Sequence, residues 1–335
     1  MKKLLSLTLL LSTIALSAQD TEETTTEKSF TVSGSVDAYY QTNLTSTDKA
    51  IFGDDLDEAQ SFGTSFANQT GFALGMANVI LAYESGKVGA VADLAFGPKG
   101  DDATGGYNIN QLYAYWNVSE NTTLTMGRFN TYLGYEVISP TGNFNYSTSY
   151  LFSSGPFSHV GLKADFALSD DFSLMLAVMN PTDVNNNTTG DYSFGAQLGY
   201  SGQYLNFYYD SGVVLGFEVD YTGGFDVSDD FFLGINAAYN DNDGSGFYGA
   251  ALYPQYGINE ALSLGVRGEY YGLHYETGDD DTVLGATLSA NYKVDNLTII
   301  PEIRLDSWNE DTYFDNDLEP TKSLAAFTLA AIYTF

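Results

Sequence analysis

The sequence predicts an all-β protein: a single transmembrane antiparallel up-and-down β-barrel of about sixteen strands (about 14 to 18). Three features favour this fold. Apolar and polar residues alternate along many short runs, as they do in strands with one face in lipid. Short polar turns alternate with longer polar links, and the chain begins with a segment typical of exported proteins.

The beginning of the sequence indicates export. Lys2 and Lys3 precede an apolar run at 4–16, and small residues follow, which is the pattern of a secretory signal peptide. A membrane anchor is disfavoured because the run is shorter than the roughly 20 apolar residues that a span needs. No other stretch reaches that length, so we expect no helical span. The predicted division is a signal peptide at 1–18, a disordered acidic lead-in at 19–28 and an outer-membrane β-barrel at 29–335.

Composition excludes several classes of protein. Charged residues make up 16% of the chain, well below the roughly 25% of ordinary soluble domains. The 43 acids against 12 bases give a formal charge of −31, which repels nucleic acid. The chain has no cysteine and so no disulfide, no lipoprotein attachment site and no thiolate metal site.

Turn-like sequences divide the chain into strands. The seven short turns lie at 84–87, 118–121, 168–171, 201–203, 227–230, 258–260 and 294–296. Their Asp, Asn, Ser and Gly residues bond nearby backbone or tolerate left-handed conformations. The eight other links lie at 46–69, 98–106, 131–157, 181–191, 210–212, 241–246, 276–281 and 309–322. Short periplasmic turns and long outer loops are the layout of bacterial barrels, so both termini are predicted on the periplasmic side.

Alternation supports the individual strands. Between Ser323 and Phe335 the larger apolar residues share one parity and small or polar residues the other, with Ile332 as the exception. A strand of this kind, ending in Phe, resembles the terminal strand of outer-membrane barrels. The same alternation runs through 215–222, 262–271, 284–293 and 297–306. A soluble β-sandwich also alternates, but the leader, the aromatic content and the turn pattern together favour a membrane barrel of a Gram-negative bacterium.

The parity opposite the apolar face predicts the lumen. The candidate pore-lining residues are Asp37, Asp93, Lys163, Asp165, Glu218, Asp220, Arg267, Glu269, Lys293, Glu302, Arg304 and Asp306. A ring of about sixteen strands is wide enough for a water channel. The charges on three successive strands, from Arg267 to Arg304, could form a ladder of opposite charges. Such a ladder would either stiffen the wall or act as a selectivity surface.

The segment 131–157 is the longest interruption between predicted strands. It is rich in Tyr, Phe, Asn and Ser and has one charged residue. This composition is too aromatic for disorder. The segment either folds back into the barrel and narrows the pore or packs as an ordered loop on the rim. Its constriction candidates are Tyr135, Glu136, Asn143, Asn145 and Tyr146.

Several short motifs carry a family resemblance. They are Met126-Gly127-Arg128-Phe129, Gly134-Tyr135-Glu136, Asn143-Phe144-Asn145-Tyr146-Ser147, Tyr150-Leu151-Phe152 and Pro156-Phe157-Ser158-His159-Val160-Gly161. This block resembles the centre of the β-barrel porins of OmpL type, and Gly34-Ser35-Val36-Asp37-Ala38-Tyr39-Tyr40 is similar to their first strand. The resemblance implies an outer-membrane porin-like barrel from about residue 29 to the end.

Catalysis and cofactor binding are not predicted. The two histidines, His159 and His274, fall near predicted strand ends, and no Ser/His/acid spacing or Gly-rich phosphate loop stands out. The sequence from Asp241 to Gly244 opens like an EF-hand loop, yet the twelfth position would be Leu252 instead of Glu. We therefore predict no enzyme, no cofactor and no metal site, and acidic loops that are solvated.

Two functions follow from these observations. The leading expectation is a channel for passive diffusion of small hydrophilic solutes or ions, weakly cation-selective, with the lipid bilayer as its other partner. The alternative is a non-conducting barrel that acts as an adhesin or a structural surface protein. One position is unexplained: Arg128 shares the lipid-facing parity of Met126, which a strand end or a bulge would resolve. No feature of the sequence indicates an oligomeric state.

Overall fold

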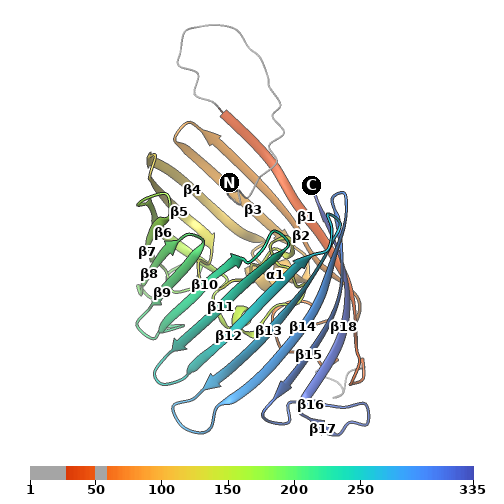
Figure 1. The fold of residues 1–335 in the computed structure, drawn as a ribbon. Coiled ribbons are helices and arrows are strands. Elements are labelled where there is room, and N and C mark those ends of the chain that lie inside the picture. The colour runs from red at the N-terminus through yellow and green to blue at the C-terminus, as the bar shows by residue number, and fades with distance from the viewer. Residues whose placement is uncertain (1–27, 50–58) are drawn as a thin grey trace.

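Sixteen strands close into one antiparallel barrel in the described part of the chain (Figure 1). The structure is a computed structural model that describes residues 28–49 and 59–335. The predicted signal peptide and all of the lead-in except Lys28 lie outside the described residues. The closed barrel confirms the predicted fold class and the predicted number of strands.

Each barrel strand pairs with its sequence neighbours, and β1 pairs with β18 to close the ring. The strands are β1 (Lys28–Asn43), β2 (Gly71–Ser85), β3 (Val88–Phe96), β4 (Ile109–Ser119), β5 (Thr122–Asn130), β6 (Ser158–Ala167), β7 (Phe172–Met179), β8 (Ser193–Tyr200), β9 (Gln203–Tyr209), β10 (Phe217–Asp226), β11 (Phe231–Asp241), β12 (Gly246–Gly257), β13 (Leu262–His274), β14 (Asp281–Val294), β15 (Leu297–Trp308) and β18 (Ser323–Thr334). The links hold helices α1 (Pro98–Thr104) and α2 (Tyr150–Ser154), the 3-10 turn η1 (Pro140–Gly142) and a hairpin of β16 (Tyr313–Phe314) and β17 (Pro320–Thr321).

The seven short turns all lie at one end of the barrel, together with the first residue of β1 and the last residues of β18. Lys28 pairs with Ser85 beside one of these turns, and Leu297 pairs with Tyr333 beside another. Polar side chains close the turns as expected: Ser228 Oγ, for example, accepts a hydrogen bond from Phe231 N at 3.1 Å. The strand ends that lead into the eight longer links lie at the other end, where Figure 1 shows the β16–β17 hairpin.

Alternation along the strands separates two faces of the wall. In β15, Ile303 and Leu305 are 49% and 48% exposed, whereas Arg304 between them is 3% exposed. An exposed apolar outer face is what a bilayer requires, and ring closure leaves no unpaired strand edge in lipid. None of the described helices is long and apolar enough to cross a membrane.

The barrel closes where Phe335 meets Gly34. The two residues exchange backbone hydrogen bonds of 3.0 Å in both directions. The ring of Phe335 lies over Gly34, so a Cβ atom at that position would come within 2.8 Å of Phe335 Cζ. The glycine therefore leaves room for an aromatic ring on the seam, where barrels carry an aromatic girdle.

Replacing Phe335 with Asp is expected to destabilise the barrel by about 1–2 kcal/mol, mainly through loss of the ring's apolar contacts at the seam. The measurement is the urea midpoint at which the unboiled, fast-migrating band is lost on a denaturing gel, in lipid vesicles. Phe335→Tyr is the matched control and should behave like the wild type. Equal midpoints for Phe335→Asp and Phe335→Tyr would show that the ring contributes nothing to closure.

Candidate functional site

The charged residues predicted for the lumen lie on the wall face opposite the exposed apolar residues. Nine of them are at most 7% exposed: Asp37, Asp93, Glu218, Asp220, Arg267, Glu269, Glu302, Arg304 and Asp306. Lys163 and Asp165 are half-buried and form an ion pair of 2.7 Å, and Lys293 is exposed near the end of β14. The role of these residues as a pore lining stays a prediction.

Residues 131–157, here called the inner loop, cross the interior of the barrel between β5 and β6. Near the start of the inner loop, Tyr132 Oη donates to Phe207 O in β9 at 2.7 Å. Further along, Tyr146 Oη donates to Asp37 Oδ2 in β1 at 2.6 Å. Seven strands separate β1 from β9 in either direction around the ring. A loop bonded to both therefore passes through the interior, where Figure 1 shows part of it in yellow-green.

Two wall carboxylates hold the backbone of the inner loop. The two carboxylate oxygens of Glu302 accept hydrogen bonds from Tyr146 N at 2.8 Å and Ser147 N at 3.1 Å. Glu269 accepts in the same way from the first two backbone N–H groups of α2, at 3.0 and 2.8 Å. Hydrogen bonds to a charged acceptor are about twice as strong as neutral ones. These acids therefore fix the path of the inner loop along β13 and β15.

Two of the three buried arginines, Arg267 and Arg304, are paired in a way that differs from the predicted ladder. Arg267 Nη1 lies 2.7 Å from Glu136 Oε1 of the inner loop, and Arg304 Nη2 lies 2.7 Å from Asp306 Oδ2 on its own strand. Within the described residues neither arginine forms an ion pair with a neighbouring strand, so the ladder prediction is wrong. Arg267 pairs with Glu136 because the inner loop places this acid beside it. Arg304 pairs with Asp306 because residues two positions apart on a strand point to the same face.

Wall glycines make room for aromatic side chains of the inner loop. A Cβ atom at Gly234 in β11 would lie 2.3 Å from Tyr135 Oη, and one at Gly265 in β13 would lie 2.4 Å from Phe144 Cε1. Each ring thus rests directly on backbone, an approach that only glycine allows. The wall sequence and the loop sequence fit each other at both positions.

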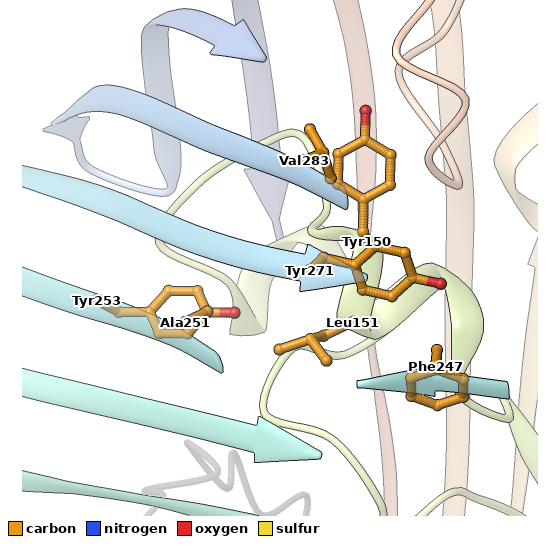
Figure 2. Close-up of a cluster of buried hydrophobic side chains, with 7 residues drawn as sticks. All are labelled: Tyr150, Leu151, Phe247, Ala251, Tyr253, Tyr271 and Val283. Carbon is orange, nitrogen blue, oxygen red and sulfur yellow. The ribbon is translucent and has the colours of Figure 1, made fainter. Parts of the chain in front are cut away.

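The short helix α2 packs its apolar side chains on the wall (Figure 2). Tyr150 stacks on Tyr271 with ring centres 5.5 Å apart. Leu151 completes a buried cluster that lies on β12, β13 and β14 (Figure 2). Its wall residues are Phe247, Ala251, Tyr253, Tyr271 and Val283. Apolar burial therefore supplements the carboxylate contacts that hold the inner loop.

The remaining constriction candidates make three kinds of contact. Tyr135 stacks on a tyrosine of β12 with 4.3 Å between ring centres. Burial, with the Glu136 carboxylate nearby, raises the pKa of the Tyr135 hydroxyl to about 12. Asn145 Nδ2 donates to Ser289 Oγ in β14 at 2.7 Å, whereas Asn143 bonds only backbone of the inner loop in the interactions described. Their role as a constriction stays a prediction.

The wall opposite β1 carries a pair of acids without a base. Asp220 in β10 accepts hydrogen bonds from Gly134 N at 3.0 Å and from the side-chain amides of Asn206 and Asn236, both at 2.6 Å. Glu218, two residues earlier on the same face, has an Oε2 atom with no hydrogen-bond partner among the described residues. Neither carboxylate forms an ion pair in the described part of the chain.

Arg128 lies close to the long-loop end of β5. It pairs with the exposed Leu112, but its side chain turns away from lipid. Nε donates to Asn110 O at 3.1 Å, and Nη1 donates to Asn185 Oδ1 in the loop between β7 and β8. The pairing of β5 shows no register shift at this point. Of the two predicted explanations, the strand end is the one observed.

The residues considered for catalysis or metal binding have structural contacts. His159 is fully buried beside the rings of Phe129 and Tyr132. Asp241 Oδ1 accepts from Gly244 N at 3.4 Å, which closes a tight turn. In the ranges that the structure describes, no group of three or more His, Cys, Asp or Glu side chains could hold a metal ion.

A second region of the interior was missed by the sequence analysis. Lys99 in α1 is 4% exposed, and its ammonium group lies 4.7 Å from the ring centre of Phe66 and 5.4 Å from that of Tyr146. Its Nζ atom has no hydrogen-bond partner among the described residues. Burial lowers the pKa of Lys99 to about 8, against the opposing effect of nearby carboxylates. Nothing in 98–106 distinguishes this segment from an ordinary polar link, so its interior position was not predicted.

A sixteen-strand barrel with a loop folded through its interior defines the class of outer-membrane porin-like barrels. The chain belongs to the family described as "Putative beta-barrel porin-2, OmpL-like", whose family model matches residues 29–335. This confirms the family resemblance seen in the sequence. The comparison with curated proteins found no match.

Solved porin structures share the fold. An anion-selective porin from Comamonas acidovorans matches with a TM-score of 0.59 and 11% identity, over 92% of this chain and 100% of that one. A loop-deletion mutant of OmpT from Vibrio cholerae matches with a TM-score of 0.55 and 11% identity, over 92% and 99%. A mutant of the Rh. blastica porin matches with a TM-score of 0.51 and 15% identity, over 92% and 100%. At these identities the likeness is one of fold alone.

Proposed function

We propose that this protein is an outer-membrane channel for passive diffusion of small hydrophilic solutes and ions. The observation that carries the proposal is the path of the inner loop, which is bonded to β1 and β9 on opposite sides of a sixteen-strand barrel. Barrels of about 16 to 18 strands leave an aqueous channel. A polar loop across that channel would set its width.

The charge on the wall supports a weak preference for cations. Of the eight acids predicted to line the lumen, only Asp165 and Asp306 form ion pairs among the described residues. Three of the four predicted bases are paired, two of them with those acids and Arg267 with Glu136. Carboxylates that keep their charge attract cations and repel anions. We also propose that the protein is exported by its signal peptide and that the short turns face the periplasm.

The experiment is conductance of the purified, unboiled protein in a planar lipid bilayer. We expect discrete current steps in KCl, because a water-filled passage carries ions whenever it is open. Protein boiled before insertion is the control and should give none. Complete lack of steps from barrels that migrate as folded on a gel would contradict the channel proposal.

A second function is favoured by the packing of the interior. The inner loop and its neighbours bury Arg267, Glu269 and Arg304 to 3% exposure or less, which is unusual for side chains in an open aqueous passage. A non-conducting barrel with an adhesive or structural role would be filled in this way. Its test is the same measurement: folded protein without conductance supports this second function.

A further inference from the structure

A second piece of chain enters the barrel beside the inner loop. Residues 61–67, here called the β1–β2 segment, follow the first strand and precede the second. Phe62, Thr64 and Phe66 are between 3% and 5% exposed. Phe62 belongs to a buried cluster with Leu324 and other residues of the wall and of the β16–β17 hairpin. The segment therefore lies inside the barrel. The sequence analysis predicted an external loop for 46–69, and this prediction is wrong for residues 61–67.

The β1–β2 segment is bonded mainly to the inner loop. Ser65 N donates to Ser153 Oγ at 2.8 Å, and Thr148 Oγ1 donates to Ser65 O. Tyr150 Oη donates to Phe62 O at 2.8 Å. The two pieces of chain therefore pack against each other within the barrel.

One wall residue joins the two pieces. Arg304 Nη1 donates to Thr64 Oγ1 at 3.0 Å and to Thr148 O at 2.8 Å. Its Nε and Nη2 groups donate to Asp306, which fixes the plane of the guanidinium. The guanidinium carbon also lies 4.4 Å from the ring centre of Phe62. A planar cation with five donors suits such a junction.

The backbone of the β1–β2 segment is held in a disfavoured conformation. Phe66 and Ala67 have φ angles of 70° and 52°, in the left-handed region that side chains with a Cβ atom rarely occupy. Two such residues in succession persist only when surrounding contacts enforce them. Phe66 packs on Phe152 and Phe157 of the inner loop, and Arg304 bonds Thr64 two residues earlier, so loss of these contacts would favour another path for the segment.

We propose that the β1–β2 segment is a second closing element of this channel and that Arg304 is its latch. The proposal rests on the proposed channel function and adds a regulated part to it. With Arg304 engaged, the segment lies on the inner loop and narrows the passage. With the contact to Thr64 lost, the strained segment withdraws and the passage widens, while the inner loop keeps its own carboxylate contacts.

Two variants at Thr64 test the latch without removing a charge from the wall. Thr64→Val keeps the shape and deletes the hydroxyl that accepts from Arg304, whereas Thr64→Ser keeps the hydroxyl and is the matched control. We expect single-channel conductance, or the fraction of time open, to rise at least about twofold in Thr64→Val and to stay unchanged in Thr64→Ser. Unchanged conductance in both variants would overturn the latch.

Cysteine chemistry adds a readout that does not need current. The chain has no cysteine, so Ser65→Cys places a single thiol on the segment. A water-soluble maleimide should label this thiol severalfold faster when Thr64→Val is added, because opening exposes it. Equal labelling rates would overturn the latch. Faster labelling in barrels that never conduct would retain the latch and reject the channel.

A disulfide supplies the converse measurement. Ser65→Cys combined with Ser153→Cys joins the segment to the inner loop at a point where they already touch. Oxidation is expected to hold conductance at its low level, and reduction to restore openings. Openings that continue unchanged in fully oxidised protein would show that the segment does not move and would overturn the proposal.

Discussion

Single-channel conductance is expected to rise about two- to fourfold when residues 138–147 of the inner loop are replaced by a short Gly-Ser linker, because this part of the inner loop is proposed to narrow the channel. The replaced residues include Tyr146, whose hydroxyl reaches β1. They leave α2 and its contacts to the wall in place. Conductance in a planar bilayer is the measurement.

A matched deletion distinguishes widening from general loosening. Residues 186–190 lie in the loop between β7 and β8 and are mostly exposed. Their removal shortens an outer loop without touching the inner loop, so conductance should stay near the wild-type value. Both variants must still show the fast-migrating unboiled band that reports a closed barrel. A loop-replaced barrel that is folded but conducts like the wild type would contradict the assigned constriction.

The strands of the barrel wall could be predicted because each strand and each short turn is indicated by residues that are close together in the sequence. The alternation at 297–306 assigned Ile303 and Leu305 outward and Arg304 inward, as the structure has them. The short turns could also be predicted, because their Ser and Asn side chains bond backbone within a few residues. Strand number follows from counting such turns, so it did not depend on any contact between distant parts of the chain.

The contents of the barrel were not predictable in the same way. Arg304 and Thr64 are 240 positions apart in the sequence, and nothing in either neighbourhood indicates that they meet. The partners of Glu302 in the inner loop are backbone N–H groups, which every residue except proline offers, so the loop sequence contains no complementary motif. The same applies to Gly234 and Gly265. A glycine is needed at these positions only because an aromatic ring of the inner loop packs against the backbone there.

Charge within the wall therefore has two roles that sequence alone did not separate. Glu302 and Glu269 are occupied by the inner loop, and Arg304 by Asp306 and its neighbours. These side chains stabilise the position of the inner loop, and their charges are already paired with hydrogen-bond or ion-pair partners. Acids that have amide partners but no cation, such as Asp220, are the candidates for attracting cations in the proposed channel. If the protein is a channel, we expect the balance between the two sets to decide its selectivity.

Glu218→Gln combined with Asp220→Asn is expected to shift the reversal potential in a KCl gradient toward zero, because it removes the acid pair on β10 that lacks an ionic partner. Both replacements keep a side-chain oxygen as an acceptor, which preserves the bond from Gly134 N to Asp220. The shift should fade at high salt, as the Debye length falls from about 10 Å at 0.1 M to about 3 Å at 1 M. The matched control is Asp229→Asn with Asp230→Asn, an equal change of charge on the exposed turn of the same hairpin, where the effect should be much smaller. If the wild type prefers anions, or if the turn variant shifts the potential as much as the wall variant does, the acids on β10 do not set the selectivity.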